Sequence, residues 1–331
     1  MENRKNLYKP VKIGKLEVPG NLFLAPLAGY TDRAFRRISR EMGADFTYTE
    51  MISSEAVVRG NDKTLDLAEK APNEEIYGIQ IFSGSAESAA GSLEKLLPFN
   101  PSVIDLNCGC PVPKIIKSGA GSALMQNPEK IREIVRALTS LTDIPVTVKI
   151  RSGWTSDTIN YLQAAEMALE GGASLISIHP RTRAQAYSGK SDWSCIKKLK
   201  EEFDVPVIGS GDLYSGEDAR RMLEETGCDA VMFARGAIGN PFVFAESKAV
   251  LTGESRTAPT EEERVEAAFR HFDYAVAYIG EERAVKEMRK HLCAYTKGIQ
   301  GGSAFRNRIV HGTSVREYKE MFDEFLGSLR L

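Results

Sequence analysis

The sequence predicts an α/β fold, a (β/α)₈ TIM barrel followed by a small C-terminal all-helical domain. Eight short runs rich in Val, Ile, Leu and Phe occur before residue 236, and each is followed by turn residues and a helical pattern. Such runs are typical of parallel strands that are buried on both faces and joined by helices. Eight of these units in about 230 residues match a TIM barrel. Beyond Gly253 the strand-like runs stop and only helical periodicity follows.

The predicted strands are short, and most of them end in a polar residue. They cover residues 22–26, 46–50, 77–82, 103–107, 146–150, 175–179, 205–209 and 230–235. The first predicted helix begins after the capping pair Thr31 and Asp32 and ends at Gly43. The later helices of the barrel are expected over residues 87–97, 127–141, 158–170, 193–201 and 215–227.

A doubly wound open sheet is the alternative fold. It would be supported by Gly-x-Gly-x-x-Gly after the first strand, but residues 25–29 are Ala-Pro-Leu-Ala-Gly. We therefore favour the barrel, with residues 1–253 as the catalytic domain and residues 254–331 as the helical domain. A linker-like stretch over residues 255–260 separates them, and Thr260 with Glu263 is expected to cap the first helix of the second domain.

Composition excludes several classes of protein. The formal charge of −2 argues against binding through bulk positive charge, although it permits a local basic face. Five cysteines without framework spacing argue against a disulfide scaffold and for a reducing compartment. Residues 1–20 lack the apolar segment of a signal peptide, and no apolar run is long enough to cross a bilayer. We expect a cytoplasmic protein with no membrane partner and no obligate protein partner.

Polar residues at successive strand ends predict the site. Active sites of TIM barrels lie at the carboxyl ends of the strands, where these side chains would meet. Each residue alone could be an ordinary hydrogen-bonding group at the end of a strand, but together they describe a polar site. The candidates are Pro26, Glu50, Gln80, Asn107 with Cys110, Lys149 with Arg151, His179 with Arg181, Gly211 with Asp212, and Arg235 with Gly236.

The loop after the fourth strand carries two cysteines. Two thiols one residue apart, without a second pair nearby, do not make a zinc site, and a disulfide between them would be strained. We expect no metal. A single thiol acting as an acid or nucleophile is the better functional interpretation. Cys110 lies farther from the strand, between Gly109 and Pro111, so we expect it to project over the barrel mouth and Cys108 to be a packing residue.

The loops after the last two strands indicate a phosphate-bearing ligand. Phosphate in TIM barrels often binds there, close to glycine backbone N–H groups. The two loops are Ser210-Gly211-Asp212 and Ala234-Arg235-Gly236. If the ligand were a flavin, Lys149 would face its ring and Gln80 its pyrimidine edge. The alternative role for Lys149 is that of a partner for a carboxylate such as Asp105.

The chain resembles the bacterial type of tRNA-dihydrouridine synthases over nearly its whole length. Two of the matching segments, Gly-Cys-Pro after the fourth strand and His-x-Arg-Thr after the sixth, are specific when found together. The matching segments are Ala25-Pro-Leu-Ala-Gly-Tyr-Thr-Asp32, Gln80-Ile-Phe82, Asp105-Leu-Asn-Cys-Gly-Cys-Pro111 with Lys114, Val148-Lys149-Ile-Arg-Ser-Gly-Trp154, Ile178-His179-Pro-Arg-Thr-Arg183, Gly209-Ser-Gly-Asp212 and Ala234-Arg235-Gly236.

The resemblance implies an FMN-binding barrel followed by a helical domain that helps to hold tRNA, with NADPH as the reductant. Cys110 would be the catalytic acid, and the departures from the family pattern at Leu27, Cys108, Pro180 and Ser210 remove no chemical role. The implied cofactor-binding residues are Pro26, Leu27 and Ala28 along the flavin, Gln80, Lys149 and His179 in contact with it, and Ser210, Gly211, Asp212, Ala234 and Arg235 at its ribityl-phosphate tail.

The implied reaction is reduction of the 5,6 double bond of a uracil in tRNA. Hydride would pass from NADPH through FMN to carbon 6, and the Cys110 thiol would protonate carbon 5 from the other face. A uracil in folded tRNA must be flipped out to reach such a site, and the surrounding phosphates need cations. Candidate substrate contacts near the barrel mouth are Asn107, Lys114, Arg181 and Arg183.

The C-terminal part supplies a basic segment. Residues 283–311 contain seven Lys or Arg against one acid, a local balance of +6. At 100° per residue, Arg283, Lys286, Lys290 and Lys297 fall on one face, opposite an apolar face. We predict that this face contacts RNA, whereas the alternative is an ordinary solvated face. The candidate tRNA residues here are Arg283, Lys286, Arg289, Lys290 and Lys297.

Two other functions are compatible with parts of this pattern. An FMN barrel acting on a free small molecule, such as a dihydroorotate dehydrogenase or an ene-reductase, would share the flavin contacts but would leave the basic helical tail without a role. A tRNA-binding or folding protein with an inactive barrel would be expected to lack Cys110 or Arg235, and both are present.

Overall fold

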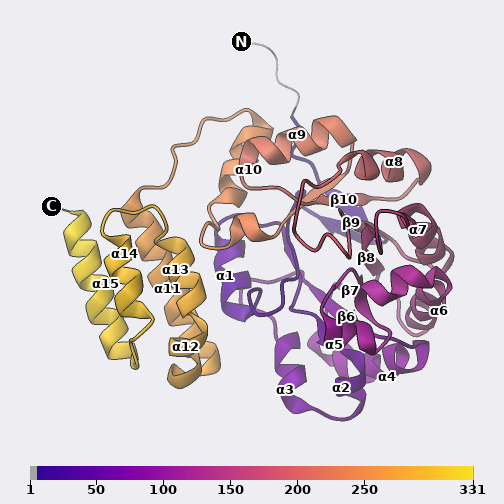
Figure 1. The fold of residues 1–331 in the computed structure, drawn as a ribbon, viewed down its shortest axis with the longest axis horizontal. Helices are drawn as coiled ribbons and strands as arrows, with labels where there is room; N and C mark the ends of the chain where they lie inside the picture. Colours follow the sequence, from indigo (N-terminus) through magenta and orange to yellow (C-terminus); the bar gives the residue numbers. More distant parts are fainter. Residues whose placement is uncertain (1–5, 331) are drawn as a thin grey trace.

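A closed ring of parallel strands forms the centre of the molecule (Figure 1). The computed structural model describes residues 6–330, so the first five positions of the predicted catalytic domain and the last position of the helical domain lie outside it. In ring order the strands are β4 (Phe46–Thr47), β3 (Leu22–Leu24), β11 (Ala230–Phe233), β10 (Val207–Ser210), β9 (Ile176–Thr182), β8 (Val146–Gly153), β7 (Val103–Cys108), β6 (Gly78–Phe82) and β5 (Ile52–Ser53). A parallel bridge between Tyr48 and Gly78 closes the ring, which confirms the predicted TIM barrel.

The second predicted strand, 46–50, is interrupted in the structure. β4 covers only Phe46–Thr47 and β5 begins at Ile52. The chain between them still follows β6, because Thr49 donates its N–H to the carbonyl of Gly78 at 2.9 Å. Glu50 then accepts the N–H of Gly29 in the loop after β3. This side-chain contact links the segment to the loop after β3, and the sequence alone did not indicate it.

Two strands on the opposite side of the ring are longer than predicted. β8 reaches Gly153 and β9 reaches Thr182, so Lys149 and His179 lie inside strands rather than at their ends. The pairing register is irregular between Arg151 and Gly153. Both extensions carry the polar residues of the site, which therefore rest on strand backbone.

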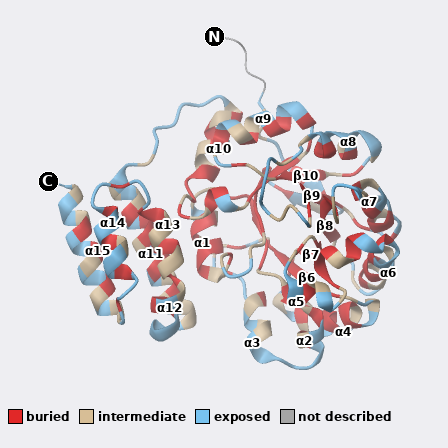
Figure 2. Ribbon diagram, viewed as in Figure 1, coloured by how far each residue is buried: buried red, intermediate tan, exposed pale blue. Residues whose placement is uncertain are grey.

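Helices surround the ring and cover its outer face (Figures 1 and 2). Their inward sides are buried and their outward sides exposed, as expected for crossover helices. The predicted cap at Asp32 is confirmed, and Ser215 caps α9 in the same way, since both side chains accept backbone N–H groups of their helices. The helices are α1 (Arg33–Glu41), α2 (Ser54–Val58), α3 (Asp62–Leu65), α4 (Ala86–Leu96), α5 (Pro113–Lys117), α6 (Pro128–Thr139), α7 (Tyr161–Glu170), α8 (Ser194–Glu202), α9 (Gly216–Thr226) and α10 (Val243–Thr252).

An N-terminal hairpin packs against the inner residues of the barrel. Its strands, β1 (Val11–Ile13) and β2 (Leu16–Val18), pair antiparallel and were not predicted. Val11, Ile13 and Val18 share one apolar cluster with inward-facing residues such as Phe23 and Met232. Because the hairpin packs against these inner residues, the apolar interior of the ring is covered on this side.

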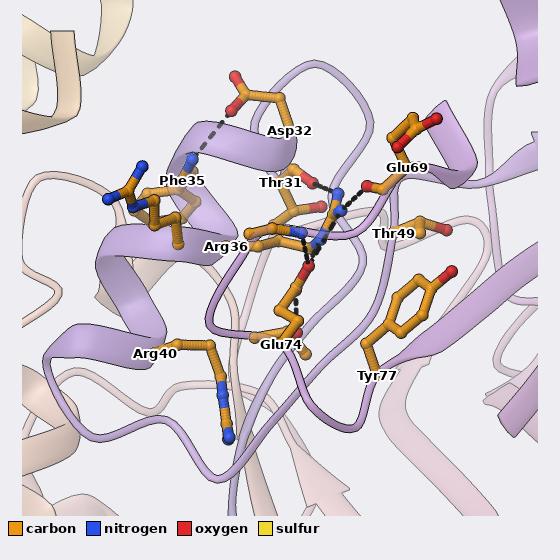
Figure 3. A network of polar contacts seen from close by, with 12 residues as sticks. Thr31, Asp32, Phe35, Arg36, Arg40, Thr49, Glu69, Glu74 and Tyr77 are labelled. Carbon is orange, nitrogen blue, oxygen red and sulfur yellow. Dashed lines mark hydrogen bonds and ion pairs between the residues drawn. The ribbon is translucent and has the colours of Figure 1, made fainter. Parts of the chain in front are cut away.

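A buried ion pair fixes α1 to the barrel (Figure 3). Arg36 donates to the Glu74 carboxylate at 2.9 Å, and their side chains are 1% and 0% exposed. The same guanidinium donates to the carbonyls of Thr31 and Glu69. Glu74 also accepts the N–H of Ala71 at 2.6 Å. Both charges are thus hydrogen-bonded on several sides, which a buried pair requires.

A helical bundle follows the barrel. Residues 254–260 lie outside helices and strands, and the predicted capping box of Thr260 with Glu263 is confirmed. The bundle has its own apolar cluster, including Phe272, Leu292 and Phe322. A domain boundary between residues 253 and 254 remains our proposal. The helices are α11 (Glu261–Ile279), α12 (Glu281–Glu287), α13 (Arg289–Tyr295), α14 (Gly302–Ile309) and α15 (Val315–Leu329).

The bundle packs against α1 through aromatic and cationic side chains. The Arg37 guanidinium lies 3.7 Å from the ring centre of Tyr274 and donates to the Tyr278 hydroxyl at 2.9 Å. Tyr274 in turn donates to Glu41 at 2.8 Å. Within residues 6–330, no helix combines the length and apolarity that crossing a membrane would require.

Candidate active site

A cavity of about 500 Å³ opens where the carboxyl ends of the barrel strands meet. It is lined by residues from the loops after β3, β7, β9, β10 and β11 and by side chains of β8 and β9. The structure therefore brings together most of the residues predicted from the sequence. Those that line the cavity are Pro26, Leu27, Ala28, Asn107, Cys110, Lys149, Arg151, His179, Ser210, Gly211, Asp212, Ala234, Arg235 and Gly236.

The cavity carries an excess of positive charge. Lys149, Arg151 and Arg235 line it, and Asp212 is the only acidic residue among its described lining residues. Arg181 lies directly behind, 1% exposed, and donates to Asp212 at 2.7 Å. Because a buried charge needs compensation, this donor set fits an anionic ligand.

Close backbone approaches shape the loops after β10 and β11. A Cβ atom at Gly211, whose φ is +115°, would lie 2.3 Å from Ser191 Oγ, and one at Gly236 would lie 2.1 Å from the carbonyl oxygen of Leu213. Only glycine fits at either position. The Arg235 guanidinium lies 3.6 Å from the Asp212 carboxylate, which joins the two loops. Arg235 therefore lines the cavity together with Gly211 and Gly236.

Asp212 orients cations and stays ionised. Partial burial acts to raise its pKa, but hydrogen bonds from Arg181 and from the Ser191 N–H, with the charge of Arg235, hold that pKa below its usual value. A carboxylate of this kind does not contact an anion itself. We assign Asp212 to positioning of Arg181 and Arg235.

His179 is a neutral ring with a defined tautomer. Burial and the charges of Lys149, Arg151, Arg181 and Arg235 lower its pKa far below the ordinary value. Arg181 lies 3.0 Å from His179 Nε2. Because a guanidinium can only donate, Nε2 accepts and the ring proton is on Nδ1.

Lys149 does not form the ion pair with Asp105 that was the alternative to a ligand contact. Asp105 is engaged instead by the Gln80 amide at 2.7 Å and the Thr147 hydroxyl at 2.5 Å. Among the described residues, Lys149 forms no salt bridge within 4.0 Å. Burial and the charge of Arg151 lower the pKa of Lys149 to about 8, although Asp105 acts in the opposite direction. The ammonium is available for a ligand in the cavity.

A chain of hydrogen bonds supports the Cys110 loop from inside the barrel. Asp105 accepts from Gln80, whose Oε1 accepts from Asn107 Nδ2 at 2.8 Å. Asn107 Oδ1 then accepts the backbone N–H groups of Gly109 at 3.1 Å and Cys110 at 2.9 Å. Gln80 is 0% exposed and does not line the cavity, so its amide supports the loop. One Nε2 hydrogen of that amide goes to Asp105 and its oxygen accepts from Asn107, and the predicted flavin contact of Gln80 stays a prediction.

The two cysteines of the loop occupy different surroundings. Cys108 is the last residue of β7, 0% exposed, and belongs to the apolar core between strands and helices. Cys110 lines the cavity with 9% exposure. Burial raises the pKa of the Cys110 thiol, although the Val112 N–H and the charge of Arg151 act in the opposite direction. A thiol of this kind is protonated at neutral pH and can act as an acid.

Arg151 connects the Cys110 loop to the loop after β9. It is 3% exposed and donates to the carbonyl of Gly109 at 2.6 Å. It also donates to the carbonyls of Thr182 and Ala186 at 3.0 Å. The sequence analysis gave Arg151 only as a polar residue at a strand end. In the structure its guanidinium joins two cavity loops by hydrogen bonds.

Several cavity residues were not among those predicted, and the largest of them are Tyr30, Met51, Tyr187 and Tyr214. Tyr187 and Tyr214 flank Arg235, whose guanidinium lies 5.0 and 5.9 Å from their ring centres. Both are 50% exposed. The sequence signal that could have identified them is a large aromatic residue in a loop after a strand. This signal is too common in sequences to mark a site by itself.

Lys114 and Arg183 lie outside the cavity. Lys114 is exposed on α5, a short helix within the segment that the sequence had suggested to be an irregular loop. Arg183 stacks on Trp154, with 4.7 Å between guanidinium and ring centre. Pro113 occupies the first turn of α5, where its missing N–H costs nothing.

The basic segment does not form a single continuous helical face. α12 ends at Glu287, α13 begins at Arg289, and Lys297 follows the end of α13. Arg283 pairs with Glu287 at 3.0 Å, and Lys286 with Glu282 at 2.8 Å. The charge of the predicted face is therefore partly neutralised. The balance of +6 was counted over residues 283–311, so it did not include Glu282.

Lys290 and Arg289 point in other directions. Lys290 reaches the cavity rim, where its ammonium lies 5.2 Å from the ring centre of Tyr30. Arg289 donates to the carbonyl of Gly312 at 2.9 Å, inside the bundle. Of the five predicted basic residues, Lys290 is the one next to the cavity.

A TIM barrel with a cationic cavity, a protonated thiol and a neutral histidine at its carboxyl face has the features of an enzyme acting on an anionic ligand. A family model described as dihydrouridine synthase matches residues 23–329. The chain belongs to the dihydrouridine synthase family.

Curated relatives match this chain over almost its whole length. The chain is 46% identical over 323 residues to a probable tRNA-dihydrouridine synthase of Treponema pallidum, covering 94% of this chain and 95% of the relative. It is 37% identical to probable tRNA-dihydrouridine synthase 1 of Synechocystis, covering 98% and 91%. It is 33% identical to tRNA-dihydrouridine synthase B of Pasteurella multocida, covering 93% of each chain.

Proposed function

We propose that this protein reduces the 5,6 double bond of specific uridines in tRNA, in the cytoplasm, with FMN as cofactor and NADPH as reductant. The observation that carries the proposal is a single cavity that combines the Cys110 thiol, Lys149 and the Arg235 loops in a chain of this family. The names of the relatives support tRNA as the substrate.

The residues present fit FMN. The Arg235 guanidinium and the glycine loops after β10 and β11 would hold the phosphate, and Ser210 and Ala234 border it. Pro26, Leu27 and Ala28 offer an apolar wall for a ring system. FMN, when bound, would supply hydride to carbon 6 of the uracil. Lys149 would stabilise negative charge on a bound ring.

Cys110 would hold the proton that goes to carbon 5. Its loop is fixed by Asn107 and Arg151 through backbone hydrogen bonds. This support limits movement of the thiol relative to the strands, as an acid in a transition state requires. After transfer, the nearby charge of Arg151 would stabilise the thiolate.

The bundle would hold the tRNA around the flipped base. Its α13 brings Lys290 to Tyr30 at the cavity rim, where phosphates next to the extruded nucleotide would lie. A barrel acting on a free small molecule would not need this cation. The barrel of an inactive tRNA-binding protein would not need a protonated thiol in a cavity.

The first test concerns the cofactor. The purified chain is expected to be yellow and to contain about one FMN, and Arg235→Ala is expected to lose most of it because the phosphate loses its guanidinium. Flavin absorbance after gel filtration and an FMN titration measure this. Arg220→Ala, on the outer face of α9 beside Glu217 and Glu224, is the matched control and should retain FMN. A colourless wild-type chain that takes up no FMN would remove the flavin from the proposal.

The second test concerns tRNA. Lys290→Gln is expected to weaken tRNA binding and to lower the slope of log affinity against log salt by about 1, as for loss of one phosphate contact. Lys286→Gln is the control, because Lys286 is already paired with Glu282 and is 63% exposed. Filter binding of unmodified tRNA at several salt concentrations measures both. Equal effects of the two variants would contradict the assignment of Lys290 to the RNA-facing rim.

A further inference from the structure

Two histidines and an aspartate meet where the bundle packs against the barrel. Asp32 is the N-cap of α1, His271 lies in α11 and His291 in α13. One side-chain ligand atom of each lies within 4.8 Å of the other two. Both imidazoles are 0% exposed, and their ring centres are 4.7 Å apart at an angle of 64°.

The imidazole nitrogens of this cluster are largely without partners. His271 Nε2 and both nitrogens of His291 have no hydrogen-bond partner among residues 6–330. Buried polar atoms are normally paired, so three such atoms at one place indicate a missing ligand. The rings are packed by Phe35, which stacks on His271 at 5.4 Å, so solvent does not reach them freely.

The surroundings orient the three groups toward one another. Asp32 Oδ1 accepts the N–H of Phe35 at 2.9 Å (Figure 3), and within residues 6–330 the other carboxylate oxygen has no hydrogen-bond partner. His271 Nδ1 lies 3.4 Å from the Tyr295 hydroxyl oxygen. When Nδ1 carries the ring proton and donates it there, Nε2 presents a lone pair. Supports of this kind are typical of metal ligands; Asp32 and His271 each have one, whereas His291 is held by packing against Phe35 and Tyr30.

We propose that Asp32, His271 and His291 bind one divalent transition-metal ion of the zinc type that pins the helical bundle to the barrel. Two imidazoles and a carboxylate are ordinary zinc ligands, and water can complete the shell. Lys290 adds an opposing charge near the cluster, because its ammonium lies 5.2 Å from the Tyr30 ring centre and that ring lies 5.5 Å from the His291 ring. The Asp32 carboxylate supplies the compensating negative charge. The sequence-based expectation of no metal considered only the cysteines, because these three residues are far apart in the chain.

The test uses the full chain, stripped with a chelator and titrated with Zn²⁺. One equivalent is expected to bind by calorimetry and to raise the unfolding temperature. Co²⁺ serves as a spectroscopic probe, because ligation by nitrogen and oxygen lacks the thiolate charge-transfer band that binding at a cysteine would give. Absence of any stoichiometric metal, or a cobalt spectrum with thiolate character, would overturn the proposal in favour of a buried water molecule.

Two variants locate the ion. Asp32→Asn retains a good N-cap, so α1 should still form, but it removes the anionic ligand and is expected to weaken Zn²⁺ binding at least about tenfold. His311→Gln alters an exposed histidine that lies 2.7 Å from the Asn307 carbonyl, and should leave Zn²⁺ binding unchanged. Equal affinity in wild type and Asp32→Asn would contradict the site. The outcome is independent of FMN and tRNA, so it fails or succeeds separately from the proposed function.

Discussion

Replacing Cys110 with alanine is expected to lower the rate of dihydrouridine formation by about 10²–10⁴-fold, the usual contribution of a positioned general acid. The thiol is buried in the cavity and its pKa is raised, so it carries a proton at neutral pH. The variant loses this proton without losing the groups that would hold the cofactor. Reduction of bound flavin by NADPH should therefore be unchanged. Single-turnover formation of dihydrouridine in unmodified tRNA measures the loss.

Cys108→Ala is the matched control for this prediction. It removes the same atom two residues earlier, but that thiol lies in the core behind β7. We expect near-normal turnover and a loss of stability of about 1 kcal/mol, as for a small truncation in a core. If Cys108→Ala abolished product formation while Cys110→Ala remained active, the assignment of the acid would be wrong.

The barrel was predictable because the sequence patterns that specify its strands and helices are local and are repeated along the chain. Each apolar run and each capped helix is recognisable by itself, and capping at Asp32 or Thr260 depends only on neighbouring residues. The break after β4 was not predicted, and the contact there between Glu50 and the N–H of Gly29 joins residues 21 positions apart, which a local pattern does not show. Strand lengths at β8 and β9 were underestimated, since polar residues inside a barrel resemble strand ends in a sequence.

The candidate site was predictable as a set of residues but not as a set of contacts. Gln80 pairs with Asp105 in the register of β6 and β7, which places its amide beside that carboxylate. Register between strands is not visible in one sequence, so its supporting position was missed. The basic tail shows the same limit, because a helical wheel shows neither the break at Met288 nor the partners of Arg283 and Lys286.

Arg36→Met is expected to destabilise the protein by about 3–5 kcal/mol, the usual cost of removing one partner of a buried ion pair. Methionine fills much of the same space, so the loss reports on charge more than on packing. Glu74, 0% exposed, would keep its contact with the Ala71 N–H but would lose its countercharge. Urea unfolding followed by circular dichroism measures the change. Arg59→Met, at an exposed pair with Glu55 on α2, is the control and should change stability by less than about 1 kcal/mol.

The double variant Arg36→Met with Glu74→Gln separates charge from hydrogen bonding. If the uncompensated carboxylate causes the loss, neutralising it should restore part of the stability, since removing both charges is often far less costly than removing one. If the carbonyls of Thr31 and Glu69, which Arg36 also serves, cause the loss, the double variant should be no better than the single one. Recovery in the double variant is expected, because a buried charge costs more than a neutral acceptor without its donor. A single variant as stable as wild type would show that α1 is held by packing alone.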